Sequence, residues 1–265
     1  MPIITLTTDL GLKDHYVASL KGSIYKEIPE VNIVDISHEI EKFNISQAAF
    51  VLKNCFADFP SGTIHIIAVR PERIDSVKVT IDHIIVEYKG QYFIGADNGI
   101  FSLIFDQSPD QVFEIDLRES PDGYLFPTKD IFVKAACHLA RGGTPQVIGL
   151  PKDSFNERKQ FSAIEDPSSI RGMVIYIDSY GNVITNITKK QFIDVGKGRP
   201  FSITFGKSRY QIDEIKSKYT DSVEGELLAL FGSSGQLEIA IAGDNAENLV
   251  GLHLTNYVTI SFYDR

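Results

Sequence analysis

The feature that most constrains the fold is a regular alternation of strand-like and helix-like segments over the first 140 residues. In the first helix-like segment, Val17, Leu20 and Ile24 follow the three-to-four spacing of one helical face, and Asp14 is placed to cap its start. We expect strands at 3–8, 31–36 and 63–69, helices at 16–28, 44–55 and 129–141, and a hairpin of 84–88 with 91–96. This order predicts an α/β domain with a mostly parallel sheet covered by helices.

The pattern changes after about residue 150. The stretch 151–169 is polar, contains two prolines and shows little periodicity. Strand-like segments then follow at short intervals, at 173–177, 183–185, 200–205, 226–231, 236–242 and 257–262, with one helix-like segment at 189–195. That spacing predicts a small all-β barrel. We therefore expect an α/β domain at 1–155, a linker at 156–168 and a β-barrel domain at 169–265.

Composition and charge narrow the possible functions. The formal net charge is −9 and the pI is near 5.2, so the chain is not expected to bind nucleic acid. No apolar run approaches the ~20 residues of a membrane span, and we expect a cytoplasmic protein without a membrane partner. Cys55 and Cys137 lie in apolar segments and are expected to be small buried residues. No metal-binding spacing, dinucleotide fingerprint or P-loop is present, and we expect neither a metal nor a cofactor.

The segment 7–16, Thr-Thr-Asp-Leu-Gly-Leu-Lys-Asp-His-Tyr, is the first that suggests a site. Asp9 lies where the first strand ends, and open α/β sheets bind ligands outside the carboxyl ends of their strands. A carboxylate there could accept hydrogen bonds from the two hydroxyls of a ribose. Two alternatives remain open: Asp9 and Asp14 could cap the turn and the helix, or Asp9, Asp14 and Asp35 could hold a divalent metal ion.

The segment 177–186, Ile-Asp-Ser-Tyr-Gly-Asn-Val-Ile-Thr-Asn, is the second. An acid, an aromatic residue, a glycine and an amide at one turn could hold a purine through hydrogen bonds. The alternative is an ordinary hairpin turn, in which glycine and asparagine supply the positive φ angles.

Five segments in a fixed order resemble one family, the S-adenosyl-L-methionine (SAM) hydroxide adenosyltransferases, or SAM hydrolases, which are related to the SAM-dependent fluorinase and chlorinase. The segments are Thr-Thr-Asp-Leu-Gly at 7–11 with the Asp, Tyr-Val and Lys-Gly that follow it, Val-Asp-Ile-Ser-His at 34–38, Phe-Ile-Gly-Ala-Asp-Asn-Gly-Ile at 93–100, the Asp-to-Asn segment at 178–186, and Phe-Gly-Ser-Ser-Gly-Gln-Leu-Glu-Ile-Ala at 231–240. The resemblance runs nearly from end to end.

The resemblance implies an α/β domain, a β-barrel domain and a homotrimer that holds SAM between the N-terminal domain of one subunit and the C-terminal domain of the next. It also implies roles for single residues. Asp9 would hold the ribose hydroxyls, Phe43 would lie near the nucleophile, Asp178 would hold the methionine amino group, Asn182 would lie near the adenine, and Ser233 would hold the methionine carboxylate. Asn98, in the segment at 93–100, is placed with these substrate-binding residues.

The implied reaction is a displacement at the ribose C5′ carbon, in which water attacks and methionine leaves. The SAM hydrolases position the water with an Asp-Arg-His set, and this chain departs from it. Arg70 replaces the Asp, Pro127 replaces the His, and the Arg falls near Val77, with Arg73 as the nearest substitute. The usual asparagine is also missing at Ala242. Thr128 lies where the halogenases have a serine that touches the halide.

We therefore place Arg70 and Thr128 with the catalytic residues and expect weak hydrolysis of SAM to adenosine and L-methionine. An Arg70 guanidinium pointing into the site would repel the sulfonium unless Glu72, Asp75 or a bound anion neutralised it. The main alternative is a non-catalytic trimer that binds SAM or adenosine. A metal-dependent phosphohydrolase built on Asp9, Asp14 and Asp35 is a third class.

Overall fold

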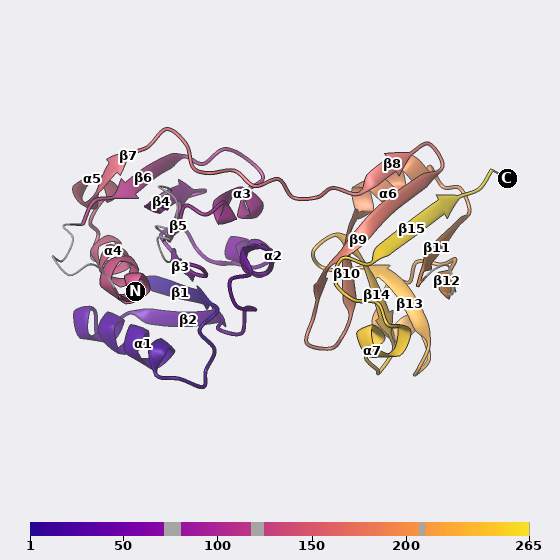
Figure 1. Cartoon of the computed structure of the whole chain (residues 1–265), viewed down its shortest axis with the longest axis horizontal. Coiled ribbons are helices and arrows are strands. Elements are labelled where there is room, and N and C mark those ends of the chain that lie inside the picture. The colour runs from indigo at the N-terminus through magenta and orange to yellow at the C-terminus, as the bar shows by residue number, and fades with distance from the viewer. Residues whose placement is uncertain (72–80, 118–124, 207–209, 265) are drawn as a thin grey trace. The chain divides into compact units, whose positions relative to one another are not determined.

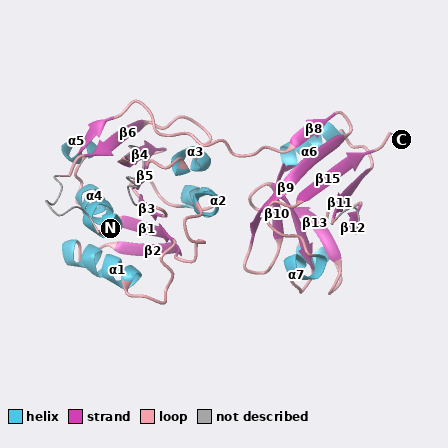
Figure 2. Cartoon of the chain, viewed as in Figure 1, coloured by secondary structure: helices cyan, strands magenta, loops and turns pink. Residues whose placement is uncertain are grey.

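The computed structural model describes residues 1–71, 81–117, 125–206 and 210–264. The chain divides into two compact units, Met1–Lys159 and Gln160–Arg265, and each is described by itself. Helices and strands alternate in the first unit, whereas strands dominate the second (Figure 2). Within the described ranges, no helix is both long enough and apolar enough to cross a membrane.

The first unit contains seven described strands in one sheet (Figure 1). They are β1 (Ile3–Thr8), β2 (Asn32–Ser37), β3 (Ile64–Ala68), β4 (His83–Tyr88), β5 (Gln91–Ala96), β6 (Gln111–Ile115) and β7 (Gly149–Pro151). The helices are α1 (Tyr16–Glu27), α2 (Ile45–Lys53), η1 (Phe56–Asp58), α3 (Ile100–Ile104), the π-helical turn η3 (Thr128–Phe132), α4 (Val133–Ala140) and α5 (Pro145–Ile148).

The strand order is β2-β1-β3-β5-β4-β6-β7. Neighbouring strands are parallel among the first four in this order, which are β2, β1, β3 and β5. Strands β4, β6 and β7 pair antiparallel with their neighbours. The direction reverses at Lys89 and Gly90, whose φ angles of 52° and 72° suit a two-residue hairpin turn. The predicted α/β fold with a mostly parallel core is therefore confirmed, with an antiparallel half added to it.

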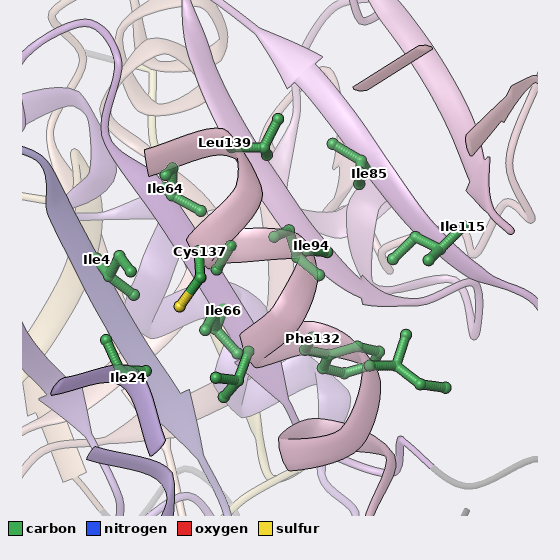
Figure 3. Packing of buried hydrophobic residues seen from close by; sticks show 14 of the residues in the cluster. Ile4, Ile24, Ile64, Ile66, Ile85, Ile94, Ile115, Phe132, Cys137 and Leu139 are labelled. Carbon is green, nitrogen blue, oxygen red and sulfur yellow. The ribbon is translucent and has the colours of Figure 1, made fainter. Parts of the chain in front are cut away.

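Two apolar clusters cover the two faces of this sheet. Alternate residues of β1, such as Ile4 and Leu6, pack with α1 and α4 in one cluster, and Figure 3 shows its isoleucines closing around Phe132 and Cys137. The other cluster packs α2 and α3 on the opposite face. Burial raises the pKa of the Cys137 thiol to about 11, so it behaves as the expected small apolar residue, and the half-buried Cys55 has a similarly raised pKa.

Two expectations about helix ends need correction. Asp14 does not cap α1, because His15 occupies the N-cap with helical dihedral angles and no side-chain cap bond, which leaves Asp14 one residue outside. The single helix expected at 129–141 is two elements, the π-helical turn η3 followed by α4. The other predicted helix start is confirmed, since the Asn44 side chain accepts a bond from Gln47 N–H at the start of α2.

The second unit is an antiparallel sheet that nearly closes on itself, which confirms the predicted small barrel. Its strands are β8 (Ile164–Asp166), β9 (Ser169–Ile177), β10 (Val183–Thr188), β11 (Phe201–Phe205), β12 (Tyr210–Ile212), β13 (Leu227–Phe231), β14 (Gln236–Ile241) and β15 (Tyr257–Phe262), and its helices are α6 (Lys189–Gly196), η4 (Tyr219–Asp221) and α7 (Ala246–Val250). The order is β12-β11-β15-β9-β10-β14-β13, with β8 on β9, and the end strands β12 and β13 contact each other. One apolar cluster fills the interior.

Candidate functional site

Asp9 lies immediately after β1, at the carboxyl end of the parallel strands, and only 6% of it is exposed. Its Oδ2 atom accepts a hydrogen bond of 2.8 Å from the backbone N–H of Phe43, and its backbone carbonyl accepts one from the Lys42 ammonium. The turn after β1 is thus tied to the segment between β2 and α2. The other carboxylate oxygen, Oδ1, has no hydrogen-bond partner in the described part of the chain and is available to a ligand.

Phe43 has an unusual conformation for an aromatic residue. Its φ angle is 64°, in the left-handed region, and 64% of the residue is exposed. Neither property stabilises the fold, because the conformation is strained and the ring is not buried. Backbone strain of this kind concentrates at binding sites.

Asp35 and Asp14 do not join Asp9 in a metal site. Burial alone would raise the pKa of Asp35, but Lys21 and His38 beside it, at 2.5 and 3.0 Å, lower the pKa overall. Within the described ranges, no group of three or more histidine, cysteine, aspartate or glutamate side chains could hold a metal ion. The proposed phosphohydrolase centre therefore has no support from the geometry.

The turn after β3 carries Arg70, which has a left-handed φ of 50°. The side-chain amide of Asn98 donates to the backbone carbonyls of Val69 and Arg70, each at 3.2 Å, and its Oδ1 accepts from Ile100 N–H. Asn98, which the resemblance places at the substrate, thus has its donor group engaged in holding the Arg70 turn. Glu72, Arg73, Asp75 and Val77 lie outside the described residues.

Thr128 is the first residue of the π-helical turn η3, directly after Pro127. The residue is fully buried, and its hydroxyl has no hydrogen-bond partner among the residues that the structure describes. Single π-helical turns are frequent at functional sites, and a buried hydroxyl without a partner is costly. Thr128 therefore carries a buried polar group that the described part of the chain leaves without a partner.

In the second unit, Asp178 organises the turn between β9 and β10. Its Oδ1 accepts the backbone N–H groups of Tyr180 and Asn182, each at 2.9 Å, and its Oδ2 accepts the Asn182 side-chain amide at 3.0 Å. Gly181 has a φ angle of 80°. The segment is thus a hairpin turn, as the simpler interpretation held, but one in which a carboxylate and an amide are fixed against each other.

That turn forms one wall of a cavity of about 710 Å³. The described residues that line it are Asp178, Tyr180, Asn182, Tyr219, Ile241, Ala242, Gly243, Asp244 and Asn245. The volume is in the range of sites for small molecules such as nucleosides. Ser233, in the turn between β13 and β14, is not among the lining residues.

Sequence analysis missed Tyr219, Asp244 and the buried Glu238. The Tyr219 hydroxyl, in the cavity wall, donates to the carboxylate of Glu238 on β14. Burial raises the pKa of Glu238, the negative charge of Asp178 raises it further, and the bond from Tyr219 works in the opposite direction. The acid in the Leu-Glu-Ile-Ala run, at a position flanked by apolar residues, was the one available signal.

Family models described as the SAM hydroxide adenosyltransferase N-terminal and C-terminal domains match residues 4–149 and 172–259. The chain is 28% identical over 274 residues to (R)-S-adenosyl-L-methionine hydrolase of Methanocaldococcus jannaschii, which covers 99% of this chain and 97% of that protein. It is 27% identical over 272 residues to a fluorinase of Nocardia brasiliensis, with 90% of each chain covered.

A solved structure gives the same result at the level of the fold. The crystal structure of an uncharacterized conserved protein from Thermotoga maritima matches with a TM-score of 0.86 at 28% identity, covering 98% of this chain and 100% of that one. Because the two family models together span most of both units, the chain belongs to the SAM hydroxide adenosyltransferase family.

Proposed function

We propose that this protein hydrolyses SAM at the ribose C5′ carbon and releases adenosine and L-methionine, at a low rate. The observation that carries the proposal is Asp9, a buried carboxylate held by Phe43 N–H with one oxygen left for a ligand, at the strand end where this fold binds ligands. The cavity beside Asp178 and Asn182 supplies a second set of polar groups of suitable size. Homotrimer formation, with residues of two subunits around each SAM, is part of the proposal.

The reaction does not need a general acid. The sulfonium of SAM is already a good leaving group, so methionine departs as a neutral thioether when a water oxygen bonds to C5′, and the water loses a proton to solvent. The protein has to hold the ribose, align the nucleophile behind the C5′–S bond and exclude bulk water. Asp9 serves the first task, and the exposed ring of Phe43 can attract the cationic sulfur through a cation–π contact.

Arg70 is the reason for expecting a low rate. A guanidinium donates hydrogen bonds but cannot accept a proton from water. If it lay ~5 Å from the sulfonium, repulsion would cost about 3 kcal/mol at an effective dielectric constant of ~20. Its positive charge would, however, favour an anionic nucleophile. The hydroxyl of Thr128, which has no partner among the described residues, could donate a hydrogen bond to the same group.

The test is incubation of the pure protein with SAM, followed by chromatography for adenosine and methionine. Relatives carry the name (R)-SAM hydrolase, so each sulfonium configuration is assayed separately. We expect adenosine and methionine in equal amounts and their loss in Asp9→Asn, in which the carboxylate becomes an amide of the same shape. Absence of both products at enzyme concentrations equal to SAM would contradict the proposal.

A second candidate is a non-catalytic trimer that binds SAM or adenosine. The observation that favours it is the replacement of two water-positioning residues of the family pattern by Arg70 and Pro127. Calorimetry separates the two candidates, because this one predicts saturable binding of SAM without products. Asp9→Ala should then weaken binding by about 1.5–3 kcal/mol, the range for hydrogen bonds to a charged group.

A further inference from the structure

Glu238 is a carboxyl group buried behind the cavity wall. Its neighbours Leu237 and Ile239 point into the barrel interior, so Glu238 lies on the other face of the sheet, where only 6% of it is exposed. Its Oε1 accepts the Tyr219 hydroxyl. Its Oε2 would lie 2.5 Å from a Cβ atom at Gly232, so the carboxyl packs directly on the backbone of the turn that carries Ser233.

Among the described residues, no cation is found in the groups that act on Glu238. The titratable groups that act on it are Tyr219 and Asp178, and the cavity lining adds Tyr180 and Asp244. The described residues that line the cavity include no lysine, arginine or histidine. Glu238 Oε2 has no hydrogen-bond partner in the described ranges. A buried carboxylate without a cation is costly, and a positively charged ligand would remove that cost.

We propose that Glu238 is a specificity-determining residue, which makes this cavity select a positively charged ligand over a neutral analogue of the same shape. The inference rests on the proposed function and deepens it, because the sulfonium of SAM is such a charge. Glu238 acts on the ligand through its charge at long range and through its hydrogen bond with Tyr219, which lines the cavity. Asp178 already accepts hydrogen bonds from three N–H groups of its own turn, so it has less capacity to accept one from a ligand.

The same arrangement couples the binding of a cationic ligand to the release of a proton from Glu238. Burial and the Asp178 charge raise the pKa of Glu238 in the free protein. A bound cation favours the ionised carboxylate and lowers that pKa, so a fraction of the molecules releases a proton on binding. By linkage, affinity for a cationic ligand increases with pH over the range in which free Glu238 still carries its proton, and affinity for a neutral ligand does not.

The experiment uses two analogues that cannot be cleaved as SAM is. Sinefungin carries an amine in place of the sulfonium, and S-adenosylhomocysteine carries a neutral thioether. Their dissociation constants are measured by calorimetry for the wild type and for Glu238→Gln, in which the amide oxygen can still accept the Tyr219 hydroxyl. We expect the preference for sinefungin over S-adenosylhomocysteine to fall about tenfold in Glu238→Gln, the effect of one screened charge at several ångströms. Glu214→Gln, which removes an exposed acid of the same unit, should leave the preference unchanged.

A measurement on the wild type keeps the inference testable if Glu238→Gln does not fold. Calorimetry of sinefungin binding in two buffers of different ionisation enthalpy, between about pH 5 and pH 8, gives the number of protons released. Proton release with sinefungin and not with S-adenosylhomocysteine supports the inference. An unchanged preference in Glu238→Gln, or equal proton release with both analogues, would overturn it while leaving the proposed function intact. Binding of neither analogue would overturn the proposed function and this inference together.

Discussion

Phe43 donates its backbone N–H to the carboxylate of Asp9 over 2.8 Å, and it does so from a left-handed conformation with a φ angle of 64°. The contact fixes the acidic side chain that directly follows β1, and the same conformation leaves the Phe43 ring in solvent. Backbone and side chain of Phe43 therefore have separate tasks: the first orients Asp9, and the second is free to meet a ligand.

Replacing Phe43 by glycine should separate these tasks. Glycine keeps the N–H group and adopts the left-handed conformation without strain, so we expect the free energy of unfolding to stay within about 1 kcal/mol of wild type. Loss of the ring removes a cation–π contact worth about 1 kcal/mol, which corresponds to about fivefold in SAM affinity. Denaturant titration and calorimetry measure the two quantities.

Lys89→Gly is the matched control for this variant. Lys89 also has a left-handed φ, 52°, and is exposed, but it belongs to the β4–β5 turn. The Lys89→Gly variant should change the free energy of unfolding as little as Phe43→Gly does, and it should leave the affinity for SAM unaltered. Equal loss of affinity in both variants would show that the Phe43 ring has no specific role.

Asn98→Asp should weaken the Arg70 turn. The substitution preserves the oxygen that accepts Ile100 N–H but removes the amide that donates to the carbonyls of Val69 and Arg70. Because these groups are partly buried, we expect the free energy of unfolding to fall by about 2 kcal/mol, measured by chemical denaturation.

Asn54→Asp provides the comparison, since the Asn54 amide also donates to a backbone carbonyl, that of Phe50, but in an exposed position. Water can replace the lost bond there, so the cost should be well under 1 kcal/mol. If the two variants lose the same stability, then Asn98 does not hold the turn in the way described.

A buried histidine predicts a pH dependence of stability. His65 in β3 receives or donates hydrogen bonds on both ring nitrogens, with Thr5 at 2.7 Å and Gln91 at 2.9 Å, and is fully buried. Burial lowers its pKa to about 4, although the hydrogen bond that Nε2–H donates to the side-chain oxygen of Gln91 works in the opposite direction. The folded state therefore binds the proton less readily than the unfolded state.

The direction of this pH dependence follows from the linkage between folding and protonation of His65. The stabilising contribution of neutral His65 is fully present above its unfolded pKa of about 6.5 and is lost as pH falls to about 4, a change of about 3 kcal/mol. Denaturant titrations of wild type across this range should show the decline, and His65→Gln should reduce it. His15→Gln, at an exposed position of the same unit, should not. A decline of equal size in His65→Gln would assign it to other groups.

The sequence predicts those helices, strands and turns that depend on residues close together along the chain. Strand β1, helix α2 with its Asn44 cap and the Lys89–Gly90 hairpin follow from periodicity and turn chemistry, and Asp9 follows from its place after β1. The short strands β7, β8 and β12 carry too few residues for a period to show, and their pairing depends on partners far along the chain.

The residues around the cavity show the same limit of prediction from sequence: contacts between residues close along the chain can be predicted, and contacts between distant residues cannot. Asp178 and Asn182 are four residues apart, so the sequence brings them together in one turn. Tyr219 and Glu238 are nineteen residues apart, and they meet only because η4, which begins at Tyr219, is brought against strand β14. A tyrosine in a polar segment and a glutamate in an apolar strand give no separate sign of that contact, and long-range pairing alone creates it.

The last prediction concerns Arg70 and Pro127, the two replacements in the family's water-positioning set. A carboxylate and an imidazole can accept hydrogen bonds from water, which a guanidinium and a proline ring cannot. Arg70→Asp also suits the left-handed φ of 50°, which aspartate tolerates better than most residues.

If positioning of the nucleophile limits the rate, the double variant Arg70→Asp, Pro127→His should release adenosine faster than wild type. We expect an increase of about a hundredfold, the lower end of what general-base catalysis contributes. Each single variant should gain less, because the two groups would act on one water. The measurement is adenosine release over time at saturating SAM. Fast hydrolysis by the wild type, with no loss in Arg70→Ala, would instead mean that the water is positioned by other groups. Thr128, whose buried hydroxyl has no partner in the part of the chain that the structure describes, would be the first to substitute.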